Sequence, residues 1–176
     1  MQSEKVGFER VTDRPCLLVI GYGNSLRRDD GAGLLLAQML HDAWAAHGHP
    51  VRLLLAHQLG PELALDIAAP DVAAVLFVDT AAHGPPLVEL TALDAAAGTH
   101  SLTHHLLPAT LLLYAERLFD RHPHGWMMRV TGRDFDHGDT LSPSVAEAVS
   151  LAAYDAERWW QMLWATGPAE PPASKL

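Results

Sequence analysis

Apolar residues occur along this chain in two patterns, short apolar runs and longer segments with a period of three to four residues. The short runs predict strands at 16–20, 51–56, 73–78 and 126–131, and a less regular one at 87–91. The first run, Cys16 to Ile20, has no polar residue, which is typical of a strand buried on both faces of a sheet.

The periodic segments lie between these runs and predict helices. They follow the first strand to about Ala46, then cover 61–69, 108–120 and 143 to at least 160. Asp29 or Asp30 is expected to cap the first of these helices, and Ser142 the last.

Strands and helices thus alternate. This order favours a three-layer α/β/α sandwich around a mostly parallel sheet. We expect one α/β domain over 16–165, a polar N-terminal extension over 1–15 and a disordered Pro- and Ala-rich tail over 166–176.

Composition and charge narrow the function classes. The formal net charge of the 176 residues is -9, which argues against a nucleic-acid partner because phosphate binding needs clustered Lys and Arg. No apolar run approaches the roughly 20 residues that span a bilayer, and no secretory signal is visible. The single cysteine, Cys16, is expected to be buried and suits a reducing cytoplasm.

The first strand leads into a loop that carries two adjacent carboxylates, Asp29 and Asp30. Gly21 and Gly23 begin a glycine pattern like that of a dinucleotide-binding turn, but its third glycine is missing. Two carboxylates at a helix start would also repel a pyrophosphate. The loop is better suited to a cation.

Asp79 follows the third predicted strand, so it emerges at the same edge of the sheet as Asp30. His104 and His105 precede a later helix and are expected at that edge too. Carboxylates with an imidazole make a plausible site for a first-row divalent ion. Six further histidines are expected in turns, in polar loops or on solvent-facing helix positions: His41, His47, His49, His122, His124 and His137.

Nucleophilic catalysis finds little support. The chain has no Gly-x-Ser-x-Gly elbow, and Cys16 lies within a strand. Asp29 and Asp30 are not expected to share a proton, because side chains of sequence neighbours tend to diverge.

Four stretches of the chain, in this order and spacing, resemble the nickel–iron hydrogenase maturation endopeptidases over roughly residues 16–160. They are Gly21-Tyr22-Gly23-Asn24-Ser25-Leu26-Arg27-Arg28-Asp29-Asp30-Gly31-Ala32-Gly33, Phe77-Val78-Asp79-Thr80-Ala81, Thr103-His104-His105-Leu106-Leu107-Pro108 and Phe135-Asp136-His137-Gly138-Asp139-Thr140-Leu141-Ser142-Pro143. The resemblance implies a flavodoxin-like or phosphorylase/hydrolase-like fold.

The resemblance also implies an aspartyl-type peptidase that removes a C-terminal peptide from the nickel-loaded precursor of a hydrogenase large subunit. Carried onto this sequence, the nickel-recognition and catalytic residues are Asp30, Asp79 and His104, with His105 as the alternative histidine. The nickel belongs to the substrate, and another divalent cation is expected to be able to replace it in crystals.

Four more residues are expected to line the substrate cleft: Asn24, Asp29, His57 and Gln58. This chain departs from the family pattern at two points. The acid in the first loop is often glutamate in the family but is Asp30 here, and the single histidine of the family is doubled as His104 and His105. The protein is expected to act as a cytoplasmic monomer without a membrane partner. Two alternatives stay open: a non-catalytic metal- or partner-binding module, and a flavodoxin-like binder of a flavin or nucleotide.

Overall fold

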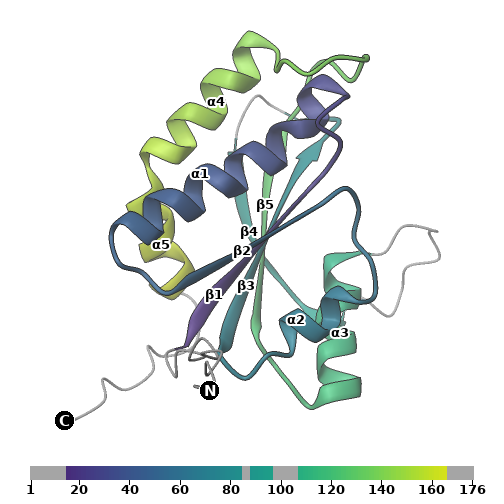
Figure 1. Ribbon diagram of the computed structural model, residues 1–176, viewed down its shortest axis with the longest axis vertical. Helices are drawn as coiled ribbons and strands as arrows, with labels where there is room; N and C mark the ends of the chain where they lie inside the picture. The colour runs from purple at the N-terminus through teal and green to yellow at the C-terminus, as the bar shows by residue number, and fades with distance from the viewer. Residues whose placement is uncertain (1–14, 85–87, 97–106, 166–176) are drawn as a thin grey trace, which may run out of the picture.

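The computed structural model describes residues 15–84, 88–96 and 107–165. Their strands form one five-stranded sheet in the order β2-β1-β3-β5-β4 (Figure 1). The strands are β1 (Cys16–Tyr22), β2 (Val51–Ala56), β3 (Val72–Ala81), β4 (Val88–Leu93) and β5 (His124–Thr131). The first three strands and β5 run parallel, and β4 pairs with β5 in the antiparallel sense. The predicted mostly parallel sheet is therefore confirmed.

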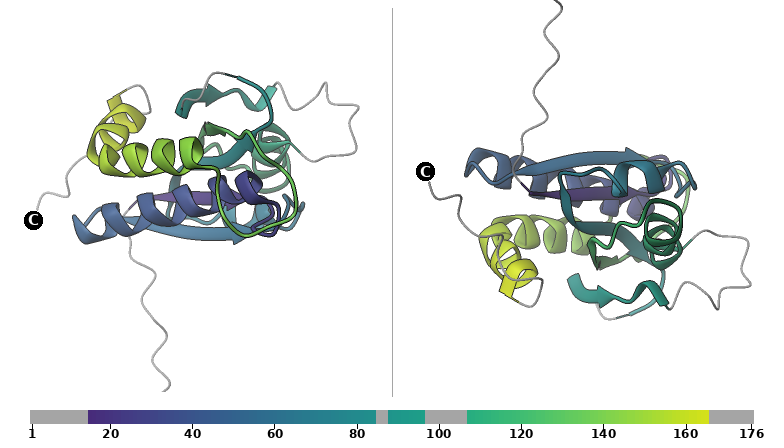
Figure 2. Two further views of the ribbon diagram at one scale, coloured as in Figure 1. Left: turned by 90° about the horizontal axis from the view of Figure 1, so that it is seen from above. Right: turned by 90° about the horizontal axis from the view of Figure 1, so that it is seen from below.

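Helices cover both faces of the sheet, which completes the three-layer sandwich. The helical segments are η1 (Arg28–Gly31), α1 (Ala32–Ala46), α2 (Leu63–Ile67), α3 (Pro108–Phe119), α4 (Pro143–Tyr154) and α5 (Ala156–Ala165). Side chains of α1, α4 and α5 share one core with one face of the sheet, and α2 and α3 share a second core with the other face. Figures 1 and 2 show α1 and α4 side by side, away from α2 and α3.

Strand β1 lies between β2 and β3 in the sheet, and its alternating side chains supply both cores. Leu17 and Val19 enter the α1 side, whereas Leu18 and Ile20 enter the α2 side. All four are fully buried. This is why the strand has no polar position, as expected for a central strand of an α/β sheet.

One of the two predicted helix caps is wrong, and the other is confirmed in position. Asp29 and Asp30 lie inside the 3-10 turn η1, and the residue that caps α1 is Gly31. Ser142 is the N-cap residue of α4, as predicted, but its side chain makes no capping bond. Its hydroxyl instead donates to the buried carboxylate of Asp29, at 2.8 Å.

The predicted last helix is interrupted. It divides at Asp155 into α4 and α5. Beside this break the Trp44 indole N–H, from α1, donates to the carbonyl of Ala156 at 2.8 Å. None of the helices in the described ranges is long and apolar enough to span a bilayer.

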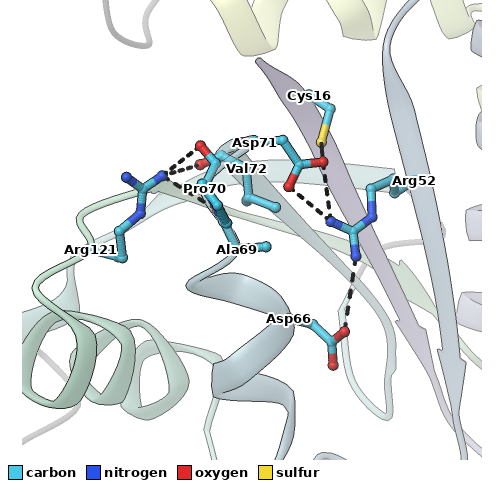
Figure 3. A network of polar contacts seen from close by, with 8 residues as sticks. All are labelled: Cys16, Arg52, Asp66, Ala69, Pro70, Asp71, Val72 and Arg121. Carbon is cyan, nitrogen blue, oxygen red and sulfur yellow. Dashed lines mark hydrogen bonds and ion pairs between the residues drawn. The ribbon is translucent and has the colours of Figure 1, made fainter. Parts of the chain in front are cut away.

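A polar network lies at the end of the sheet where β1 and β3 begin (Figure 3). Arg52 donates to both carboxylate oxygens of Asp71, at 3.2 and 3.3 Å, and the thiol of Cys16 lies 3.5 Å from the same carboxylate. Burial, followed by the charge of Asp71, raises the pKa of the Cys16 thiol to about 11. The thiol is therefore protonated at neutral pH, and its predicted burial is confirmed.

Candidate functional site

A cleft of about 600 Å³ opens at the carboxyl ends of β1 and β3. Two carboxylates line it, Asp30 from η1 and Asp79 from β3. This is the edge of an α/β sheet at which ligands bind, because loops rather than packed strands determine its shape. The structure thus brings together two of the three residues predicted to recognise a metal.

Asp79 is held in a partly buried position. Its Oδ1 accepts the backbone N–H of Thr80 at 2.7 Å, and the Tyr22 hydroxyl donates to its carboxylate. Burial, the largest effect, raises the pKa of Asp79, and the nearby charge of Asp30 adds to this. The bonds from Thr80 and Tyr22 and the charge of Arg129 oppose the shift without cancelling it. A carboxylate destabilised in this way gains from a cationic partner.

Asp30 is fixed by the loop that precedes it. Its Oδ2 accepts the backbone N–H of Asn24 at 3.2 Å. Gly23 has φ +143°, and a Cβ there would lie 2.2 Å from the carbonyl oxygen of Asp30. Only glycine fits this close approach, so Gly23 lets the loop fold back against the turn that carries Asp30.

A second close contact sets the start of α1 against Asp79. The N–H of Gly33 donates to Oγ1 of Thr80 at 3.1 Å. A Cβ on Gly33 would lie 2.8 Å from Cα of Asp79. The helix that follows Asp30 is therefore packed directly on the strand that carries Asp79, which fixes the spacing of the two carboxylates.

Asp29, predicted to line the cleft, is instead fully buried beside it. Its carboxylate accepts the backbone N–H groups of Arg133, Asp134 and Ser142, and the Ser142 hydroxyl, at 2.7 to 2.9 Å. Burial alone would raise the pKa of Asp29, but these four bonds outweigh it and lower the pKa. Asp29 thus holds the loop of residues 132–142 in place.

Further contacts join the same loop to Arg28, the first residue of η1. Arg28 forms an ion pair with Asp134, and its backbone N–H donates to the carbonyl of Gly138 at 2.9 Å. Arg28 adopts φ +45°, which is unusual for a residue with a side chain. Hydrogen bonds therefore join two of the stretches that carry the family resemblance, 21–33 and 135–143, next to Asp30.

The other predicted cleft residues divide into three groups. His57 and Gln58 line the cleft together with Asp30 and Asp79. Asn24 is not among the residues that line it; its side-chain oxygen accepts the N–H of Leu26 at 2.9 Å. His104 and His105 lie outside the described residues, while Leu107 and Pro108 line the same cleft.

A metal site therefore stays a prediction. Within 15–84, 88–96 and 107–165, no three His, Cys, Asp or Glu side chains are grouped so that they could hold a metal ion. Asp30 and Asp79 would supply two oxygen ligands, and a third ligand would have to come from His104, His105 or the substrate. Carboxylate oxygens with one imidazole suit a first-row divalent ion.

Sequence reasoning missed Tyr22. Its hydroxyl bonds to Asp79, and its ring lines the cleft. Burial, and then the charge of Asp79, raises its pKa, so the hydroxyl keeps its proton and acts as a donor. Its place at the carboxyl end of β1 was the available signal, but the glycines on either side favoured a simple turn.

Solved structures of hydrogenase maturation proteases share this fold. The maturation protease HycI from Thermococcus kodakarensis KOD1 matches with a TM-score of 0.61 and 24% identity, over 83% of this chain and 93% of that one. The maturating endopeptidase HybD from E. coli gives a TM-score of 0.59 and 20% identity, over 84% and 91%. HybD from Thermococcus kodakarensis gives 0.54 and 21%, over 81% and 97%.

These identities establish likeness of fold, and at that level the resemblance seen in the sequence is confirmed. No protein-family model matches the sequence, and no curated protein matches it significantly.

Proposed function

We propose that this chain is an endopeptidase that removes a C-terminal peptide from the nickel-loaded precursor of a NiFe hydrogenase large subunit. The observation that carries the proposal is the pair of carboxylates, Asp30 and Asp79, in one cleft of a fold shared with proteins named as hydrogenase maturation endopeptidases. His104 is the proposed third member of the site, because its spacing to Leu106 and Pro108 fits the family pattern better than that of His105.

The nickel acts in this proposal as the docking signal and arrives with the substrate. A nickel ion held by the precursor gains two oxygen ligands from Asp30 and Asp79 and a nitrogen ligand from the histidine. The raised pKa of Asp79 fits this role. A bound cation would compensate both the cost of burying the Asp79 charge and its repulsion by Asp30.

The test is cleavage of a purified precursor with and without nickel. We expect the nickel-loaded precursor to release a C-terminal peptide, detected by mass spectrometry, and the nickel-free precursor to stay intact. Binding without cleavage by the wild-type protein would favour the non-catalytic binding module. Equal cleavage of both precursors would remove nickel from recognition.

Substitutions test whether Asp30 and Asp79 belong to the site. Asp30→Asn and Asp79→Asn should each lower the cleavage rate by roughly 100-fold or more, because each removes a charge at the site while keeping the side-chain shape. The matched control is Glu147→Gln, an exposed position on α4, which should cleave at the wild-type rate. Wild-type cleavage by either Asp variant would remove that residue from the site.

The same assay separates the two histidines. His104→Ala should abolish cleavage, whereas His105→Ala should retain most of it. The reverse result would assign the role to His105. We also propose that the enzyme acts as a cytoplasmic monomer, which light scattering of the purified chain tests for the oligomeric state.

A further inference from the structure

A second cavity, of about 490 Å³, lies next to the cleft on the side of β2. Its walls are mainly apolar and include Leu34 and Leu35 of α1 and Leu55 of β2. Leu35 and Leu55 are 45% and 49% exposed, although both are large apolar side chains. We call this cavity the β2 pocket.

The β2 pocket and the carboxylate cleft adjoin each other. Gly23 and His57 line both of them. A side chain at position 23 is excluded by the carbonyl of Asp30, so the boundary between the two cavities carries only backbone at this point. An extended polypeptide bound in the cleft can therefore pass over Gly23 into the β2 pocket.

The edge of β2 offers backbone partners for such a polypeptide. Among the strands of the described residues, β2 is the outermost on this side of the sheet, next to β1. The backbone bonds at the two ends of this pair, from Leu17 to Pro50 and from Gly23 to Ala56, show that even-numbered residues of β2 face β1. Because the pattern alternates along a strand, Val51, Leu53 and Leu55 direct their backbone N–H and C=O groups outward.

We propose that an extended segment of the substrate precursor, next to the scissile bond, adds to the outer edge of β2 and places an apolar side chain in the β2 pocket. Recognition by strand addition combines these two features: backbone bonds hold the segment, and pockets select alternate side chains. This inference rests on the proposed function, because the occupant is the same polypeptide that reaches Asp30 and Asp79.

Kinetics test the pocket. Leu35→Glu and Leu55→Glu place a charge where the apolar side chain binds, so each should raise KM for the nickel-loaded precursor roughly 10-fold or more while kcat stays within about twofold. Leu151→Glu on α4 is the matched control, since Leu151 is 61% exposed and lines neither cavity. It should keep the wild-type KM. Circular dichroism confirms that each variant is folded.

Cross-linking tests the occupant directly. Cys16 is 3% exposed and is the chain's single cysteine, so a cysteine introduced by Leu35→Cys can be labelled selectively with a thiol-reactive benzophenone. Irradiation during turnover should join this position to the precursor's C-terminal region, as mapped by mass spectrometry. The same label introduced by Leu151→Cys should not give this product.

The results of these experiments distinguish failure of the proposed endopeptidase function from failure of the proposed binding at β2. If the wild-type protein does not cleave the precursor, the proposed function fails. If it cleaves and both Glu variants keep the wild-type KM, the β2 inference fails and the function stands. A cross-link between two copies of this chain, with loss of a dimer in the Glu variants, would show that the pocket is a self-association surface and would also overturn the inference.

Discussion

Asp29 and Asp30 are neighbours in the sequence and perform different tasks. Asp29 is fully buried and accepts four hydrogen bonds from the loop of residues 132–142, whereas Asp30 lines the cleft. The sequence indicated that the two side chains diverge, and it favoured Asp30 for the site. It wrongly expected Asp29 to line the cleft as well, because the four donors that hold Asp29 come from residues more than 100 positions away.

The role of Asp29 leads to a prediction for stability. The pKa of Asp29 is lower in the folded protein than in the unfolded chain, so its charged form stabilises the fold above about pH 4. This contribution is lost as the pH falls through the folded pKa. Asp29→Asn should lower the free energy of unfolding at pH 7 by about 2–4 kcal/mol, since it removes the charge that the four donors satisfy.

Urea unfolding followed by circular dichroism at pH 7 and at pH 3 measures this effect. The difference between wild type and Asp29→Asn should be smaller at pH 3. Asp139→Asn, at an exposed position of the same loop, is the control and should be near wild type at both values. A constant difference at the two pH values would show that the charge of Asp29 is not what stabilises the loop.

At the scale of elements, short apolar runs alternate with segments that have a helical period of apolar residues. This alternation was enough to predict the sheet, the main helices and the edge of the sheet at which the site lies. What it missed depends on contacts between distant parts of the chain. The reversal of β4 follows from its pairing with β5. The break at Asp155 lies beside a hydrogen bond from Trp44, which is more than 100 residues earlier.

The packing of α1 on β3 predicts the direction in which Gly33→Ala changes the free energy of unfolding. Helix propensity alone would make Gly33→Ala stabilising, by up to about 1 kcal/mol. The added Cβ, however, meets the backbone of Asp79 at 2.8 Å, so α1 has to shift. We expect a loss of about 1–3 kcal/mol in the free energy of unfolding and slower cleavage, because the shift separates Asp30 from Asp79.

Thermal unfolding and the cleavage assay together measure this change. A Gly33→Ala variant that is more stable than wild type and fully active would mean that α1 and β3 adapt without moving the carboxylates.

On the scale of the whole molecule, the site and the most aromatic part of the core lie at opposite ends. Trp160 of α5 contacts Trp44, Trp164 and His49, and the ring centroids of His49 and Trp160 are 4.1 Å apart. His49 also bonds to Glu157 at 3.0 Å, so the prediction that it faces solvent is wrong. The partners of His49 belong to a helix that begins more than 100 residues later.

This separation predicts that stability and activity can be changed independently. Trp160→Ala should lower the free energy of unfolding by about 2–3 kcal/mol, because it removes a large, partly buried side chain. Cleavage per folded molecule should stay near wild type at temperatures below unfolding. A large loss of activity in fully folded Trp160→Ala would show that α5 influences the cleft.

The bonds between Asp29 and the loop of residues 132–142 also bear on the order in which the protein matures during its own synthesis. β1, η1, α1 and β3 leave the ribosome first, and they carry both Asp30 and Asp79. Until Arg133 has emerged, the Asp29 carboxylate lacks all four of its donors, and until Ser142 has emerged it still lacks two of them. A nascent chain therefore contains both acidic residues well before their positions are fixed, so we expect the proposed cleavage activity to begin only after residues 132–142 have been translated.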